Sequence, residues 1–302
     1  MILQLASSIT FYSSLATRHL SLVTCHPSLL MIDPRQLLKQ FGLRPKKSLG
    51  QNFLIDNQAL DQIVRAAEVT ADDVVLEIGP GLGSLTQHLA AVAKRVIAVE
   101  IDANLIPLLK AQVADRSNVE IVQGDILDLD PADLLQGATT YKVVANIPYY
   151  ITSAIIRHLL EASIKPSLMV LTIQNEVAER IVAQPDDMSL LAVSVQFYGS
   201  PRIVTNIQAG AFYPAPNVDS AVVRIVLDAR PRYPVNSVDT FFSVVKAGFS
   251  QKRKQIHNSL VGGLGKSREE VDQLLQEASI DPKRRAETLT LDEWTRLANL
   301  VV

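Results

Sequence analysis

The sequence predicts an α/β fold with a seven-stranded, mostly parallel sheet, followed by a small C-terminal α-helical domain. From residue 73, short apolar runs rich in β-branched residues alternate with amphipathic stretches of helical period. This alternation is typical of βαβ units in a Rossmann-like, doubly wound sheet. After residue 230 the strand pattern stops, and the chain continues as helices joined by short polar links.

Seven segments carry the strand pattern. They are 73–78, 95–100, 119–123, 142–146, 167–173, 202–207 and 218–227. Helices are expected between them, one after Gly83 and one after Asp102, whose side chain suits an N-cap and which places Pro107 near the first turn. Two further helices are expected near 175–183 and 188–199.

The C-terminal pattern predicts helices from about residue 237 to the end, a break at 261–265 and a final helix around Trp294. The Pro- and Arg-rich segment 230–236 is expected to be the linker that precedes them.

Three parts follow from these patterns: an N-terminal extension at 1–30, a sheet domain at 31–229 and a helical domain at 230–302. The extension is rich in Ser, Thr and Leu, contains no acid and precedes Met31, which resembles a natural start. We expect it to be disordered or an over-called start, and organellar import is the less favoured alternative. The helical part is basic, with twelve Lys and Arg against nine acidic residues.

Composition excludes several classes of protein. A single cysteine, Cys25, rules out an internal disulfide framework, and the five histidines form no cluster at metal-ligand spacing. Apolar runs stay shorter than the roughly 18 residues that a membrane span needs. These features predict a cytoplasmic protein with no metal and no membrane partner, and we expect a monomer.

A glycine-rich turn follows the first predicted strand directly. Gly79, Gly81 and Gly83 let the backbone turn tightly and approach a ligand before the next helix begins. Ser84 stands where a dinucleotide-binding G-x-G-x-x-G motif needs its third glycine, which disfavours NAD. The turn also lacks the Gly-Lys-Ser/Thr ending of a phosphate-binding P-loop.

Acidic residues mark the ends of the next two strands. Glu100 ends the second strand about 20 residues further on, where a carboxylate can accept hydrogen bonds from the ribose hydroxyls of an adenosine. Asp125 follows the third strand and offers an acceptor for the adenine amine. Glycine, Glu and Asp in this order are expected for S-adenosylmethionine. For each carboxylate the alternative is a helix N-cap, which suits Asp102 better.

The tetrad Asn146, Ile147, Pro148 and Tyr149 ends the fourth strand. It is good turn chemistry by itself, because Pro fixes φ and Asn tolerates unusual backbone angles. At the carboxyl end of a strand near a ligand turn, however, it can present two carbonyl oxygens and an aromatic face to one planar amine. N-methylation of a nucleobase is therefore the leading hypothesis, with Tyr149 stacking on the adenine and Phe212 closing the opposite face.

Ordered motifs across about residues 33–300 resemble ribosomal RNA adenine dimethyltransferases of the KsgA type. The motifs are KSLGQNFL (47–54), EIGPGLGSLT (77–86), NIPY (146–149), QNEVAER (174–180), FYPAPNVDS (212–220), FSQKRKQIHNSL (249–260) and RAETL (285–289). Two positions depart from the pattern: Tyr150 stands where many members carry Asn, and Asn175 replaces a common Lys.

This resemblance implies a class I methyltransferase fold that uses S-adenosylmethionine. It also implies dimethylation of N6 on two adjacent adenines in the terminal hairpin loop of small-subunit ribosomal RNA, with either the free RNA or a 30S pre-ribosomal particle as the substrate. By motif position, the cofactor-binding residues are Asn52, Leu54, Gly79, Gly81, Glu100, Asp125 and Asn146.

Lys252, Arg253 and Lys254 lie within the helical part and are expected to bind RNA phosphates, with a solvated surface as the bland alternative. Two other functions stay open. One is a large-subunit adenine methyltransferase of the antibiotic-resistance type, and the other is a non-catalytic ribosome-assembly or transcription factor on the same fold.

Overall fold

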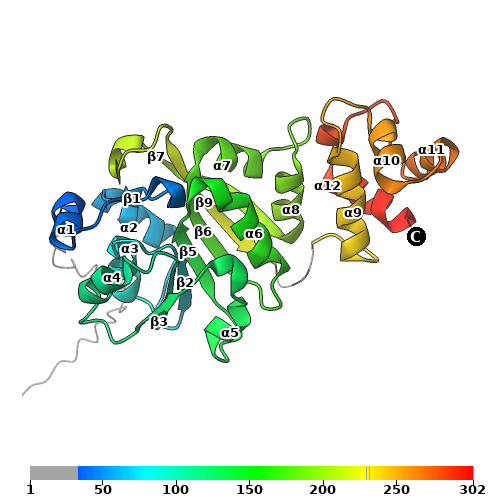
Figure 1. The fold of residues 1–302 in the computed structure, drawn as a ribbon. Helices are drawn as coiled ribbons and strands as arrows, with labels where there is room; N and C mark the ends of the chain where they lie inside the picture. Colours follow the sequence, from blue (N-terminus) through cyan, green and yellow to red (C-terminus); the bar gives the residue numbers. More distant parts are fainter. Residues whose placement is uncertain (1–32, 229, 231, 302) are drawn as a thin grey trace, which may run out of the picture. The chain divides into compact units, whose positions relative to one another are not determined.

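The computed structural model describes residues 33–228, 230 and 232–301 (Figure 1). The predictions for the N-terminal extension 1–30 therefore lie outside the described residues. Among the described residues, no helix has the length and apolar character needed to cross a membrane.

The main sheet has seven strands in the order β4-β3-β2-β5-β6-β9-β7, which confirms the predicted fold class. Neighbouring strands from β4 to β6 are parallel, and β9 runs antiparallel to both β6 and β7. The strands are β2 (Val74–Ile78), β3 (Arg95–Glu100), β4 (Val119–Gln123), β5 (Lys142–Asn146), β6 (Leu168–Gln174), β7 (Gly199–Ile207) and β9 (Ser220–Leu227). The chain reverses its direction of winding between β2 and β5, which makes this the topological switch point.

A second, two-stranded sheet was not predicted. Strand β1 (Phe53–Leu54) pairs antiparallel with β8 (Phe212–Tyr213), with Leu54 opposite Phe212. These strands belong to two motifs that are far apart in the sequence. Their pairing brings the segment before α2 next to the segment before β9.

Helices flank the sheet strands in Figure 1, with α2, α3 and α4 on one side and α5, α6 and α7 on the other. The helices of this part are α1 (Pro34–Gln40), α2 (Asn57–Ala66), α3 (Ser84–Ala90), α4 (Ile106–Gln112), α5 (Pro131–Leu135), α6 (Thr152–Glu161), α7 (Asn175–Val182) and α8 (Leu190–Tyr198). Short 3₁₀ helices are η1 (Lys47–Leu49), η2 (Ile126–Asp128), η3 (Tyr149–Ile151), η4 (Ala209–Ala211) and η5 (Ala286–Thr288).

The expected N-cap role of Asp102 is wrong. Helix α4 begins later, at Ile106, and its N-cap is Leu105, so Pro107 lies in the first turn where a missing N–H costs nothing. Asp102 instead accepts hydrogen bonds from the backbone N–H of Asn104 and from the side chain of Lys46. Residues 103–105, which were expected to begin the helix, form a turn between β3 and α4.

Four helices form the C-terminal part: α9 (Val238–Phe249), α10 (Ile256–Leu264), α11 (Arg268–Glu277) and α12 (Leu291–Leu300). The predicted break at 261–265 is wrong for its first four residues, because α10 continues through both central glycines to Leu264 and the helix is terminated only at Gly265, whose backbone is left-handed. A Cβ on Gly263 would meet Ala247 of α9 at 2.5 Å. The glycine therefore permits close helix packing, a tertiary reason that local propensity does not reveal.

Two hydrophobic clusters hold these layers together. The first joins the sheet to α5, α6 and α7. The second contains residues of α9 to α12 together with Ala192, Val193 and Phe197 of α8. The ring of Phe197 stacks on Phe241 with a centroid distance of 4.4 Å. Helix α8 thus contributes to both clusters, because its Val195 packs in the first.

Candidate active site

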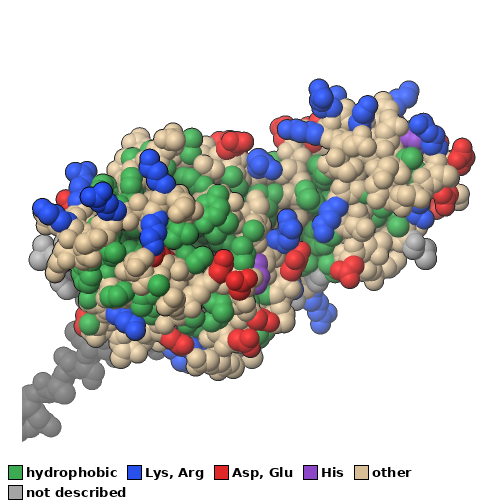
Figure 2. Space-filling model, in the orientation of Figure 1, with side chains coloured by type: hydrophobic (Ala, Val, Ile, Leu, Met, Phe, Trp, Pro, Cys, Tyr) green, Lys and Arg blue, Asp and Glu red, His purple; other side chains and the backbone are tan. Residues whose placement is uncertain are grey.

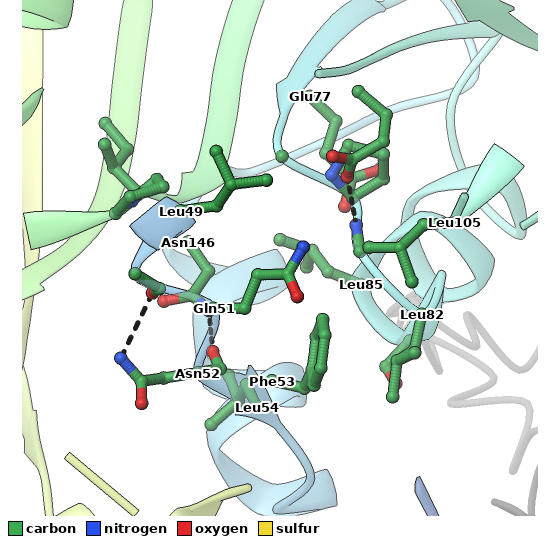
Figure 3. Close-up of a pocket in the computed structure, with 18 of the residues that line it drawn as sticks. Leu49, Gln51, Asn52, Phe53, Leu54, Glu77, Leu82, Leu85, Leu105 and Asn146 are labelled. Atoms are coloured by element: carbon green, nitrogen blue, oxygen red, sulfur yellow. Dashed lines mark hydrogen bonds between the residues drawn. The ribbon is translucent and has the colours of Figure 1, made fainter. Parts of the chain in front are cut away.

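A pocket lies at the carboxyl ends of β2, β3 and β5, beside the switch point of the sheet (Figure 3). Its walls come from the glycine turn after β2, from Glu100 and Ile101, from the tetrad after β5 and from the segment 49–54. Ligands of open α/β sheets bind in this crevice. The structure therefore brings the predicted glycine, acid and tetrad motifs together around one cavity.

The glycine turn is closed by Glu100. Its Oε2 accepts a hydrogen bond from the backbone N–H of Gly81 at 3.0 Å, and its Oε1 accepts one from Asp102 at 2.8 Å. Gly81 has a φ of 57°, and a Cβ there would meet the ring of Phe53 at 2.9 Å. Only glycine fits this position without displacing Phe53 from the pocket wall.

Glu100 is 4% exposed. Burial raises the pKa of its carboxyl group, and the two backbone N–H groups oppose that shift because they stabilise the charged form. Each carboxylate oxygen keeps a further lone pair beyond its backbone bond. Glu100 can therefore accept hydrogen bonds from ribose hydroxyls while it fixes the glycine turn.

The sequence did not reveal the hydrogen bonds that hold Asp102, the residue whose backbone N–H donates to Glu100. Asp102 accepts hydrogen bonds from Lys46 Nζ at 2.7 Å and from Gln51 Nε2 at 2.9 Å. Burial opposes its charge, but these bonds lower the pKa of Asp102 overall. These two hydrogen bonds connect Lys46 and the adjoining motif at 47–54 to the turn after β3. In the sequence, the presence of Gln51 in that motif was the only indication of this contact.

Asn146 is held in a defined orientation at the end of β5. Its Nδ2 donates a hydrogen bond to the backbone carbonyl of Asn52 at 2.9 Å. The side chain of Asn52 in turn donates to the carbonyl of Gly50. With its donor engaged, the amide of Asn146 keeps Oδ1 as an acceptor, and no described residue donates to it.

Tyr149 lines the same pocket and is anchored at its far end. Its hydroxyl lies 2.7 Å from Ser220 Oγ, at the start of β9. Burial, with the nearby charge of Asp219, raises the pKa of Tyr149 against the effect of this hydrogen bond. Ser220 therefore fixes the ring, a role that its place in the motif at 212–220 did not reveal. Ile147 and Pro148 complete the tetrad, and Ile147 is buried.

Leu54 and Gly79 also line the pocket, whereas three other groups of predicted residues lie outside its lining. Asp125 caps η2 by accepting from the backbone N–H of Leu127 at 3.0 Å. Phe212 is 3% exposed and pairs with Leu54. Residues 252–254 form the exposed loop between α9 and α10. Their roles in binding cofactor or RNA stay predictions.

The pocket contains a second acid that was not predicted. Glu77 lies in β2 and is 1% exposed. Burial raises the pKa of its carboxyl group to about 8, against the effect of the Thr86 hydroxyl and with a contribution from the charge of Glu100. A group with this pKa is mostly protonated at neutral pH. Its signal in the sequence was the acid at the start of the motif 77–86.

These residues fit S-adenosylmethionine better than a dinucleotide. The acidic side chains of β2 and β3 suit a ligand with a positive charge and ribose hydroxyls, and the Gly81 turn leaves room for close approach. No Lys or Arg lines the described pocket to meet a pyrophosphate. Fold and site together define a methyltransferase of class I that depends on S-adenosylmethionine.

The chain belongs to the ribosomal RNA adenine dimethylase family, whose model matches residues 42–301. It is 46% identical over 268 residues to the ribosomal RNA small subunit methyltransferase A of Dehalococcoides mccartyi strain 195, covering 89% of this chain and 92% of that protein. The protein of the same name from Moorella thermoacetica is 45% identical over 272 residues, covering 87% of this chain and 94% of the relative. The predicted family and cofactor are confirmed.

Solved structures agree with this assignment. The 23S rRNA methyltransferase ErmE is 30% identical with a TM-score of 0.65, over 82% of this chain and 98% of that one. A dimethyladenosine transferase from Plasmodium falciparum is 25% identical with a TM-score of 0.68, over 81% of this chain and 95% of that one. Both confirm the predicted fold class.

Proposed function

We propose that the protein dimethylates N6 of two adjacent adenines in the 3′-terminal hairpin loop of small-subunit ribosomal RNA. The observation that carries this proposal is the fixed amide of Asn146, whose Oδ1 remains an acceptor at the end of β5. The small-subunit target is supported by the names of relatives that match along nearly their whole length. S-adenosylmethionine supplies the methyl group as an electrophilic sulfonium.

The proposed chemistry depends on orientation of the target amine. The N6 lone pair of adenine is delocalised into the ring, so the amine must pyramidalise before it attacks. The side-chain oxygen of Asn146 and the backbone carbonyl of Ile147 accept its two hydrogens and direct the lone pair. Tyr149, anchored on Ser220, stacks on the unpaired base. The proton leaves after transfer, so a strong base is not required.

A large-subunit target is the second candidate, because ErmE is 30% identical to this chain. The two functions separate by mass spectrometry of nucleosides after incubation of 30S and 50S particles with the protein and labelled cofactor. We expect N6,N6-dimethyladenine in the terminal loop of 30S RNA. Modification of 50S RNA alone would favour the second candidate, and no modification of either would favour the non-catalytic alternative.

For the parts of the chain, we propose that 31–229 form the catalytic domain and that 230–302 contribute RNA contacts. Figure 2 shows Lys and Arg side chains gathered on the C-terminal helices, where the α9–α10 loop lies in Figure 1. Lys252, Arg253 and Lys254 are exposed there and form no ion pair with a described residue. We further propose a cytoplasmic monomer that acts on a 30S particle.

Replacing Lys252, Arg253 and Lys254 together by Ala is expected to weaken RNA binding for all sequences. The slope of log affinity against log salt should flatten by up to about 0.7–0.9 for each lost phosphate contact. Filter binding across a salt series measures it. Exposed Lys94 and Lys110, changed to Ala, serve as the control and should leave the slope nearly unchanged. An unchanged slope in the triple variant would show that the loop is only a solvated surface.

A further inference from the structure

Glu77 is a buried acid that the proposed transfer step does not use. It lies in β2, lines the cofactor pocket and is 1% exposed (Figure 3). Its Oε2 and the Oγ1 of neighbouring Thr86 are both fully buried, and neither atom forms a hydrogen bond with a described residue. An unpartnered polar atom of this kind is costly, which indicates that a ligand or a proton completes it.

The surroundings of Glu77 contain negative charge and no positive charge. From β3, Glu100 faces it, and both oxygens of Glu100 already accept backbone N–H groups. From α3, the neutral hydroxyl of Thr86 faces it. Tyr149 is the one other ionisable side chain in the described lining, which includes no Lys, Arg or His. Of the two carboxyl groups, Glu100 is the one stabilised as an anion, so Glu77 is the one that keeps a proton.

We propose that Glu77 is an uncharged carboxylic acid in the free protein and ionises when the positively charged part of S-adenosylmethionine enters the pocket, so that cofactor binding releases a proton. This inference rests on the proposed function only in taking S-adenosylmethionine as the ligand. The O–H bond of Glu77 breaks, its proton passes to the solvent, and the carboxylate becomes the counter-charge of the bound cation. Glu77 is thus a positioning residue for the cofactor, and its own charge depends on the charge of the bound ligand.

The raised pKa of Glu77, about 8, agrees with this view. At pH 7 a group with that pKa carries about 0.9 of a proton, and a cation beside it lowers the pKa again. Cofactor affinity should therefore rise with pH by up to about tenfold per unit below pH 8 and level off above it. Without such ionisation, the pH dependence of affinity in this range would be the same for the wild type and Glu77→Gln.

Isothermal titration calorimetry of the full chain with S-adenosylmethionine tests the proposal. Binding enthalpies in phosphate and in Tris at pH 7 give the number of protons released, because the two buffers differ in ionisation enthalpy. We expect the wild-type protein to release close to one proton more than Glu77→Gln. The ionisation of the free ligand is the same for both proteins and cancels in this difference. The exposed Asp115→Asn variant is the control and should behave like the wild type.

S-adenosylhomocysteine identifies the cation that Glu77 meets, since it keeps the α-ammonium group but lacks the sulfonium charge. If Glu77 faces the sulfonium, the extra proton is released with S-adenosylmethionine only. If it faces the ammonium, both ligands release the proton. Equal proton release by the wild type and Glu77→Gln with both ligands would overturn the proposal. Failure of the protein to bind S-adenosylmethionine at all would instead overturn the proposed function.

A measurement without ligand gives an independent readout of the same proton. In the pH window from 4.5 to 8 the folded protein holds a proton on Glu77 that the unfolded chain has lost. The contribution of Glu77 to stability should therefore be present below pH 4.5 and decrease as pH rises toward 8. The melting temperature of the wild type should fall, relative to that of Glu77→Gln, across this window. Parallel curves would contradict the proposal.

Thr86→Val keeps the proposal testable if Glu77→Gln does not fold. The Thr86 hydroxyl lowers the pKa of Glu77, so its replacement by an isosteric methyl group should raise that pKa further. Proton release on cofactor binding should then persist to a higher pH than in the wild type. A midpoint that stays in place would show that the released proton does not come from Glu77.

Discussion

Replacing Asn146 by alanine is expected to lower the rate of methyl transfer by about 10²–10³, the scale for loss of one positioned polar group from an active site. The variant loses the acceptor Oδ1 and also the hydrogen bond from Nδ2 to Asn52. RNA affinity should change much less, because phosphate contacts elsewhere dominate it. Single-turnover transfer to 30S particles, with filter binding of the same RNA, measures the two effects separately.

A matched variant distinguishes orientation of the amine from support of the pocket wall. Asn146→Asp keeps acceptor oxygens but loses the N–H that holds Asn52. If acceptance from the target amine matters most, this variant should retain more activity than Asn146→Ala. Near-normal transfer by Asn146→Ala would refute the orientation mechanism. A lowered melting temperature together with loss of both activities would assign the tetrad a structural role as a turn.

Glu100→Ala is expected to weaken S-adenosylmethionine binding by roughly 1.5–3 kcal/mol, the usual value of a hydrogen bond to a charged group. That range corresponds to about a 10–150-fold higher Kd. The loss has two sources, since the carboxylate offers acceptors to the ribose and also holds the backbone N–H of Gly81 and Asp102. Binding calorimetry of the full chain measures the change.

Glu100→Gln is the matched control because it keeps one acceptor oxygen and nearly the same shape. We expect its affinity to lie between those of the wild type and Glu100→Ala. An unchanged affinity in both variants would remove Glu100 from the cofactor site. Competition with NAD provides a second test, since tighter binding of NAD than of S-adenosylmethionine would contradict the class of the enzyme.

The succession of strands along the chain and the edge of the sheet where the pocket lies could be predicted from the sequence because both follow from local patterns. A glycine turn after one strand, Glu100 after the next and Asn146 after a later one lie at the same edge of any parallel sheet. The strand pattern was therefore enough to predict that these residues lie close together, without knowledge of tertiary contacts. Even where the structure differs, as at the start of α4, the shift is a few residues.

The missed features depend on contacts between distant segments. The pairing of β1 with β8 joins strands of two residues each, too short to give a periodic pattern. Gly263 lies inside α10 because α9 packs so close to it that a Cβ at this position would collide with Ala247. Likewise, the bonds of Lys46 and Gln51 to Asp102 join segments that are some fifty residues apart. No local propensity indicates such partners.

The double role of helix α8 has a consequence for how this protein unfolds. Val195 packs against the sheet cluster, whereas Phe197 stacks on Phe241 in the cluster of the C-terminal helices. A chain that ended before α9 would expose Phe197 and its neighbours to water, and the sheet would lose the support of a well-packed α8. We therefore expect the two regions to melt cooperatively, because neither retains its full stability once the other has unfolded.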